Sequence, residues 1–143
     1  MVLNLMLGTL VISLTVVIHI IGLMAVTRAI GWVGDRIRLH GHRNRIVAMV
    51  TTVLGIFCVL TVEVWTWAGA FYGLAIMPDF ETALYFSIVS FCTLGYGDIV
   101  PAHPWRILAA LEGVNGFLLI GWSTAYLVAA GIRVGPFRTG EHF

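Results

Sequence analysis

The chain has 143 residues, of which 59% are hydrophobic and only 10% are charged. A soluble domain carries about a quarter charged residues, so this composition excludes an ordinary soluble protein and indicates a membrane protein. All eight basic residues are Arg and the formal net charge is +1, so nothing in the charge balance points to a nucleic-acid partner.

Three apolar segments are long enough to cross a bilayer, for which a helix of about 20 residues suffices. Residues 2–27 carry no charge, and we predict that 1–28 forms a retained N-terminal transmembrane helix, since no basic region precedes it as in a signal peptide. Residues 46–77 contain a single acid, Glu63, and 105–132 contain a single acid, Glu112. We therefore predict three spanning helices over these ranges.

A fourth apolar segment is too short to cross. The eleven residues 82–92 would reach only about 16 Å as a helix, roughly half the bilayer. Asp79 stands where it can cap such a helix, and Glu81 falls in its first turn, where negative charge is favoured. We predict a helix over 80–92 that enters the membrane and a loop that turns back.

The arginines are distributed unevenly between the two ends of the spans. Seven of the eight lie between the first two spans or after the last: Arg28, Arg36, Arg38, Arg43, Arg45, Arg133 and Arg138. Because basic residues stay in the cytoplasm, we expect the N-terminus outside, and the connection 29–45 and the tail 135–143 inside. The sequence leaves open whether 29–45 is a helix at the membrane interface or an irregular loop.

The half-length segment leads into the polar sequence TLGYGD, residues 93–98. Irregular backbone at membrane depth is tolerated only inside protein or along a watery cavity. Gly95 and Gly97 can adopt positive φ, which lets the backbone alternate in hand and point successive carbonyls the same way. Stacked rings of carbonyls can replace the hydration shell of a potassium ion.

The segment DFETALYFSIVSFCTLGYGDIVP, residues 79–101, resembles the pore helix and selectivity filter of tetrameric pore-loop potassium channels, in particular the KcsA-like two-helix channels of bacteria. The resemblance covers roughly residues 46–132; the helix 1–28 has no counterpart in it. It implies an all-α membrane protein with three transmembrane helices, a re-entrant pore helix and a filter loop, assembled as a four-fold homotetramer. It further implies passive K⁺ conduction across a bacterial-type inner (plasma) membrane, with no organic cofactor and no enzymatic activity.

The resemblance also assigns roles to residues. It implies that K⁺ binds the backbone carbonyls of a filter made of Thr93, Leu94, Gly95, Tyr96 and Gly97. It places four supports around that filter: Tyr85, Phe86, Cys92 and Asp98. Leu94 and Cys92 replace the more usual Val and Thr, and Phe86 lacks a polar tip to bond Tyr96. Val89 stands where the best-known bacterial relative has a carboxylate partner for the Asp98 position.

Two acids and a histidine lie within the predicted spans. Counted from the span ends, Glu63 and Glu112 fall at a similar depth, beside the short helix. We expect them either to support the filter by bonding groups of the short helix such as Tyr85, Ser87 or Ser90, or simply to hold helices together. Depth argues against a pairing of His19 with Glu63, which leaves a packing histidine or a proton relay. Asn115 is expected to bond between helices.

Glycines interrupt the last span and suggest either close packing or a gating bend. The gating candidates are Gly113, Gly116, Gly121, Leu118 and Trp122. The resemblance favours Gly116 as the hinge, and it implies that four residues line the inner cavity: Leu118, Trp122, Ala125 and Ala129.

Two functions other than ion conduction can be compared with the sequence. A non-conducting or regulatory membrane subunit that keeps the pore-loop fold is the main alternative. A membrane enzyme would need a nucleophile–base pair or a metal cluster, which the sequence does not suggest. Cys58 and Cys92 lie in apolar segments without C-x-x-C spacing, so we expect small buried residues rather than a zinc site or a disulfide.

Overall fold

The computed structural model describes the backbone of residues 1–37 and 42–134, and the side chains of 1–32 and 45–133. In this part every regular element is a helix, in the order α1 (Val2–Ile37), α2 (His42–Gly73), α3 (Phe80–Phe91), η1 (His103–Trp105) and α4 (Arg106–Val134). Stretches of α1 and α2, and α4 with η1, are long and apolar enough to cross a membrane, which confirms the three predicted spans. The shorter α3 is the predicted half-length helix.

The helix boundaries differ from the predicted ones near the arginines. The backbone of α1 continues to Ile37, well past the apolar segment, and α2 begins at His42. Arginine is a good helix former, so a basic segment need not end a helix that is already nucleated. The predicted connection 29–45 is therefore largely helical where it is described; residues 38–41 and the predicted tail 135–143 lie outside the described residues.

The helix α3 begins where the sequence predicts. Asp79 has an extended backbone, and its carboxylate accepts hydrogen bonds from the Thr82 amide and the Thr82 hydroxyl, both at 2.8 Å. These bonds stabilise the ionised carboxylate and lower the pKa of Asp79 below its ordinary value. Glu81 occupies the first turn, as expected. The N-cap thus fixes the point at which the chain re-enters the bundle after α2.

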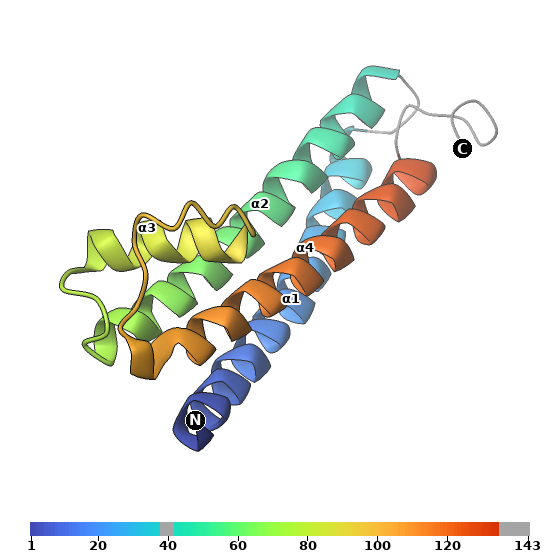
Figure 1. Ribbon diagram of the computed structural model, residues 1–143. Helices are drawn as coiled ribbons and strands as arrows, with labels where there is room; N and C mark the ends of the chain where they lie inside the picture. The colour runs from blue at the N-terminus through green and yellow to red at the C-terminus, as the bar shows by residue number, and fades with distance from the viewer. Residues whose placement is uncertain (38–41, 135–143) are drawn as a thin grey trace.

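The three long helices form a bundle, with α3 beside the C-terminal half of α2 and the N-terminal half of α4 (Figure 1). α1 runs antiparallel to α2 and parallel to α4. Two glycines fix the register of α1 on α2, because a Cβ on Gly22 would meet Val59 and a Cβ on Gly55 would meet Val26. Small residues at such positions let helix backbones approach closely.

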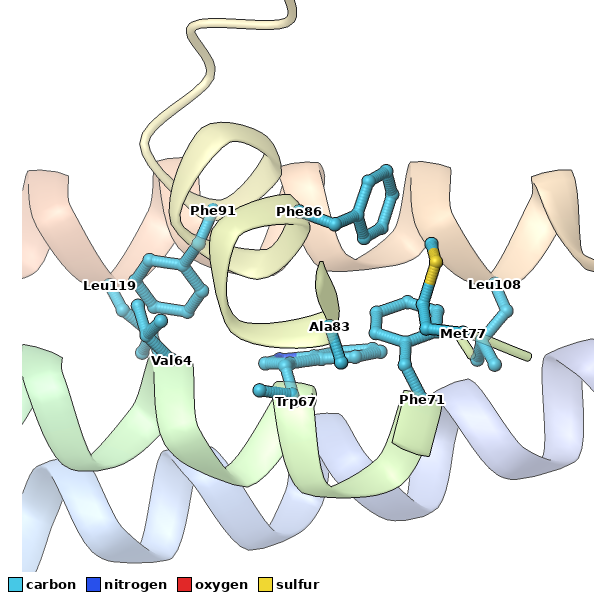
Figure 2. Close-up of a cluster of buried hydrophobic side chains, with 10 residues drawn as sticks. Val64, Trp67, Phe71, Met77, Ala83, Phe86, Phe91, Leu108 and Leu119 are labelled. Atoms are coloured by element: carbon cyan, nitrogen blue, oxygen red, sulfur yellow. The ribbon is translucent and has the colours of Figure 1, made fainter. Parts of the chain in front are cut away.

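A buried apolar cluster holds α3 against α2 and α4 (Figure 2). Trp67 and Phe71 of α2 are completely buried beneath α3. Phe71 meets Phe86 of α3 edge to face, with ring centroids 5.2 Å apart. Phe91 and Leu119 close the other end of the cluster. Such a dry, aromatic contact leaves α3 little freedom to move relative to α2.

Hydrogen bonds make α1 part of the same bundle. Asn115 of α4 donates to the Thr15 hydroxyl at 2.8 Å, which confirms the predicted interhelical role of Asn115. The Thr27 and Tyr126 hydroxyls share a bond of 2.8 Å at the other end of α1. Polar bonds of this kind join transmembrane helices that hydrophobicity alone would not hold together. The additional helix is therefore packed against α4 along most of its length.

Candidate functional site

The loop that follows α3 alternates in backbone hand. Thr93, Gly95 and Gly97 have φ values of 58°, 58° and 76°, while the intervening Leu94 and Tyr96 are not in the left-handed region. Positive φ is rare for a β-branched residue such as Thr93, so the surrounding structure must hold this conformation in place. The alternation is the feature expected of a backbone that presents successive carbonyls in one direction.

The loop is attached to the last turn of α3 through its amides. The Thr93 amide donates to the Ser90 carbonyl at 3.0 Å, and the Leu94 amide donates to the Val89 carbonyl at 2.9 Å. In contrast, no hydrogen bond within the described part of the chain ends on a carbonyl of residues 93–96. These oxygens therefore stay available to a ligand.

Two side chains of this loop are widely exposed in the single chain. Leu94 is 55% exposed and Tyr96 is 68% exposed. Phe86, named from the sequence as a brace for Tyr96, is buried against Phe71 instead. The single chain thus leaves Tyr96 without the aromatic brace that the resemblance implies from Phe86.

Tyr85 and Asp98 form a bond across the loop. The Tyr85 hydroxyl donates to the Asp98 carboxylate at 2.7 Å, so the residue after the loop is tied back to α3. This bond stabilises the carboxylate and lowers the pKa of Asp98 below its ordinary value of 3.8. Both residues could be named from the sequence but their contact could not, because Val89, at the position of the expected partner, cannot bond a carboxylate and nothing in the sequence points to Tyr85 instead.

Removing this bond should change how the loop responds to acid. A lowered carboxylate pKa contributes stability that is complete above about pH 4 and is lost as the pH falls through the folded-state pKa. We expect Tyr85→Phe to reduce the thermal stability of the chain at pH 7 and to flatten the acid dependence below pH 4. Thermal unfolding of both proteins between about pH 7 and 2.5 measures this. Parallel acid profiles for the two proteins would show that the bond contributes nothing.

Glu112 lies behind α3, with buried polar atoms around it. Its carboxyl lies beside the Ser87 hydroxyl of α3 but makes no hydrogen bond of good geometry with it. Both carboxyl oxygens, the Ser87 hydroxyl and the Trp67 ring nitrogen are buried and have no partner in the described residues. Buried polar groups normally have partners, so this unpaired pair of side chains is unusual. Glu112 and Ser87 are polar residues in an otherwise apolar interface between α4 and α3.

Glu63 contacts α1 rather than α3. Its carboxyl bonds the Nδ1 atom of His19 at 2.8 Å, and both side chains are completely buried. The prediction that depth keeps His19 away from Glu63 is wrong. The ends of the apolar segments do not give the relative depth of residues on two different helices. That depth depends on the register of α1 on α2, which the contact of Gly22 with Val59 sets.

The three glycines of α4 differ in their surroundings. A Cβ on Gly116 would overlap the Phe91 carbonyl at the end of α3, and a Cβ on Gly113 would make ordinary contact with the Ser90 carbonyl at 3.6 Å. Nothing lies within 4 Å of a Cβ on Gly121. Of the two roles left open for Gly116, the structure supports close packing against α3.

The exposed surface of α4 includes a residue that sequence reasoning missed. Phe117 is 68% exposed and Leu118 is 62% exposed. Trp122 and Ala129, expected to line the inner cavity, lie on the side of α1 in the single chain: the Trp122 ring is 5.1 Å from the His19 ring, and Ala129 borders a groove between α1 and α4. Phe117 could have been found from the sequence, because it stands in an uninterrupted run of apolar residues on α4.

The prediction that Cys58 and Cys92 are buried is wrong, because both side chains are exposed in the single chain.

Comparisons with known proteins agree with this arrangement. A family profile described as "Ion channel" matches residues 59–133, just over half of the chain. Two-pore potassium channel 5 of Arabidopsis thaliana is 32% identical over 88 residues, which are 61% of this chain and 20% of that protein. Two pore potassium channel c of Oryza sativa subsp. japonica is 44% identical over 60 residues, which are 42% of this chain and 12% of that protein.

The chain spans a fifth or less of the length of these relatives. No solved structure matches it. The profile match contains α3, the loop after it and α4 up to Arg133, together with the second half of α2. An all-helical membrane chain with this match is not an enzyme: it belongs to the pore-loop ion-channel family and is distantly similar to potassium channels.

Proposed function

We propose that this chain forms a potassium-selective channel that conducts K⁺ passively, with residues 93–97 as its selectivity filter. The observation that carries the proposal is the alternation of left-handed φ at Thr93, Gly95 and Gly97, combined with carbonyls that no internal hydrogen bond uses. Ion ligands would be the backbone carbonyls of four residues: Thr93, Leu94, Gly95 and Tyr96. Carbonyl oxygens in stacked rings replace the water that K⁺ loses on entry.

A single chain supplies only one side of each ring, so the proposed channel is a homotetramer with closed four-fold symmetry. The wide exposure of Leu94, Tyr96 and Phe117 supports this, because these apolar or aromatic side chains would be covered by neighbouring copies. In such an assembly the C-terminal end of α3, which is partly negative, would point toward the cation path.

The proposed orientation follows the arginines. The N-terminus and the loop after α3 would face the outside of a plasma (inner) membrane, and the Arg-rich end of the bundle would face the cytoplasm. Filter support in this proposal comes from the Tyr85–Asp98 bond, from Cys92 at the end of α3, and from Glu112 behind Ser87. Phe86 would contribute only by holding α3 against Phe71 of α2. Glu63 would act indirectly, through its bond to α1.

Ion flux from vesicles tests the proposal. Purified protein in K⁺-loaded vesicles should release K⁺ much faster than Na⁺-loaded vesicles release Na⁺, and barium should block the flux. Gly95→Ala should abolish K⁺ flux, because a side chain in the left-handed region costs about 1–2 kcal/mol in every subunit. Gly69→Ala is the matched control, since nothing lies near a Cβ at this helical glycine.

Two outcomes would count against the proposal. Equal flux of Na⁺ and K⁺ would contradict selectivity while leaving a pore. A folded tetramer without any flux would favour a non-conducting subunit that keeps the pore-loop fold.

A further inference from the structure

A groove lies between α1 and α4 at the end of the bundle that carries the arginines. Its volume is about 370 Å³, within the range of about 300–1,000 Å³ that is usual for small-molecule sites. It is lined by Thr27, Ile30, Gly31, Tyr126, Ala129, Ala130 and Arg133. It is remote in sequence from the proposed filter, and three of its seven lining residues come from α1.

The lining combines an apolar wall with one cationic residue. The Thr27 hydroxyl bonds the Leu23 carbonyl and the Tyr126 hydroxyl, so the polar atoms at this part of the wall already have partners. Gly31 has nothing within 4 Å of a Cβ, which leaves the groove open beside α1. No hydrogen bond or ion pair within the described residues engages Arg133. A ligand that fits has an apolar part for the wall and an anionic part for the guanidinium.

The position of the groove in the bilayer narrows the choice of ligand. The uncharged part of α1 ends at Thr27, next to Arg28, and that of α4 ends at Ile132, next to Arg133. Trp and Arg are typical of the membrane interface, where Arg extends its charged end toward the lipid headgroups. Ala129 and Ala130 lie about one helical turn inside Arg133, so this part of the wall lies at acyl-chain depth and Arg133 lies at headgroup depth.

We propose that this groove binds an anionic phospholipid, with an acyl chain against α1 and α4 and the phosphate at Arg133. A second copy of the chain is a less suitable occupant. At roughly 3.6 residues per turn, Tyr126 and Arg133 share one side of α4, whereas Val114 and Phe117 lie on a side well removed from it. Phe117, the most exposed apolar side chain of α4, thus lies away from the groove, although Trp122, which is 46% exposed, lies one turn from Tyr126.

Lipid retention tests the proposal independently of channel activity. The full chain would be purified in detergent and titrated with phosphatidylglycerol or with phosphatidylcholine of the same acyl chains, and bound lipid counted by native mass spectrometry. We expect phosphatidylglycerol to bind more tightly. Arg133→Gln should weaken its binding about fivefold, which corresponds to about 1 kcal/mol for one basic residue near an anionic headgroup. Arg106→Gln, at the opposite end of α4, is the matched control and should bind as the unmodified chain does.

A second variant distinguishes binding in the groove from a general attraction between Arg133 and anionic lipid. Ala130→Leu fills the apolar wall and keeps Arg133, so it should also reduce phosphatidylglycerol binding. Unchanged binding in Ala130→Leu, or an equal loss in Arg133→Gln and Arg106→Gln, would overturn the proposal. Competition by glycerol phosphate without acyl chains would mean a simple anion site. Loss of tetramers in Ala130→Leu would mean that a second copy occupies the groove.

Discussion

Gly116→Ala is expected to prevent the assembly of a stable, conducting channel. The added methyl group would overlap the Phe91 carbonyl at the end of α3, and backbone cannot move aside as a flexible side chain can. Overpacking of this kind costs about 1–3 kcal/mol or more, which exceeds the gain of about 1 kcal/mol that alanine brings to a helix interior. The displaced carbonyl belongs to Phe91, two residues before Thr93, so its displacement would also shift the loop proposed to bind K⁺.

The neighbouring glycines of α4 supply matched controls. Gly113→Ala adds an ordinary contact with Ser90, and Gly121→Ala adds none, so both should assemble and conduct. Gly121→Ala should also raise the melting temperature, since alanine favours a helix interior. Tetramer content by size-exclusion chromatography and K⁺ flux would be measured for all three variants. If Gly116→Ala assembled as well as Gly121→Ala, the close approach of α4 to α3 would be disproved.

His19→Leu is expected to destabilise the bundle, although the residue lies outside the match to the channel family. The substitution puts an apolar side chain of similar size in place of the imidazole and leaves the Glu63 carboxyl without its partner at 2.8 Å. A buried polar group that loses its partner costs about 1–3 kcal/mol. The net value of a hydrogen bond between transmembrane helices averages only about 0.6 kcal/mol. Most of the loss should therefore come from the unpaired acid.

A double-mutant cycle distinguishes this account from simple loss of packing. His19→Leu with Glu63→Leu should be more stable than the sum of the two single variants predicts, because neither acid nor imidazole is left unpaired. Ser13→Leu, at an exposed position of α1, should have little effect. Thermal unfolding in detergent measures all four. Strict additivity would show that the pair is not coupled in the folded chain.

The features that could be predicted from sequence depend on local pattern. Hydropathy located the three spans, and the length of the apolar segment before Thr93 identified α3 as too short to cross. Asp79 marked the start of that helix because its cap needs only the next three residues. Gly95 and Gly97 predicted a backbone with left-handed positions for the same local reason.

The features that could not be predicted depend on how helices are rotated and shifted against each other. His19 meets Glu63 only because Gly22 and Gly55 bring α1 close to α2 in one register. The partner of Asp98 is Tyr85, which required knowledge of how the loop returns over α3. The position of Gly116 against Phe91 depends on the crossing of α4 with α3. Hydropathy and spacing along one segment contain none of this information.

The reversal potential of channels in a planar bilayer tests the central claim most directly. With K⁺ on one side and Na⁺ on the other at equal concentration, a filter of carbonyl rings over residues 93–97 predicts a current carried by K⁺. The reversal potential should then lie far from zero, on the side set by the K⁺ gradient. A reversal potential near zero, with current of similar size for both ions, would contradict a potassium-selective filter.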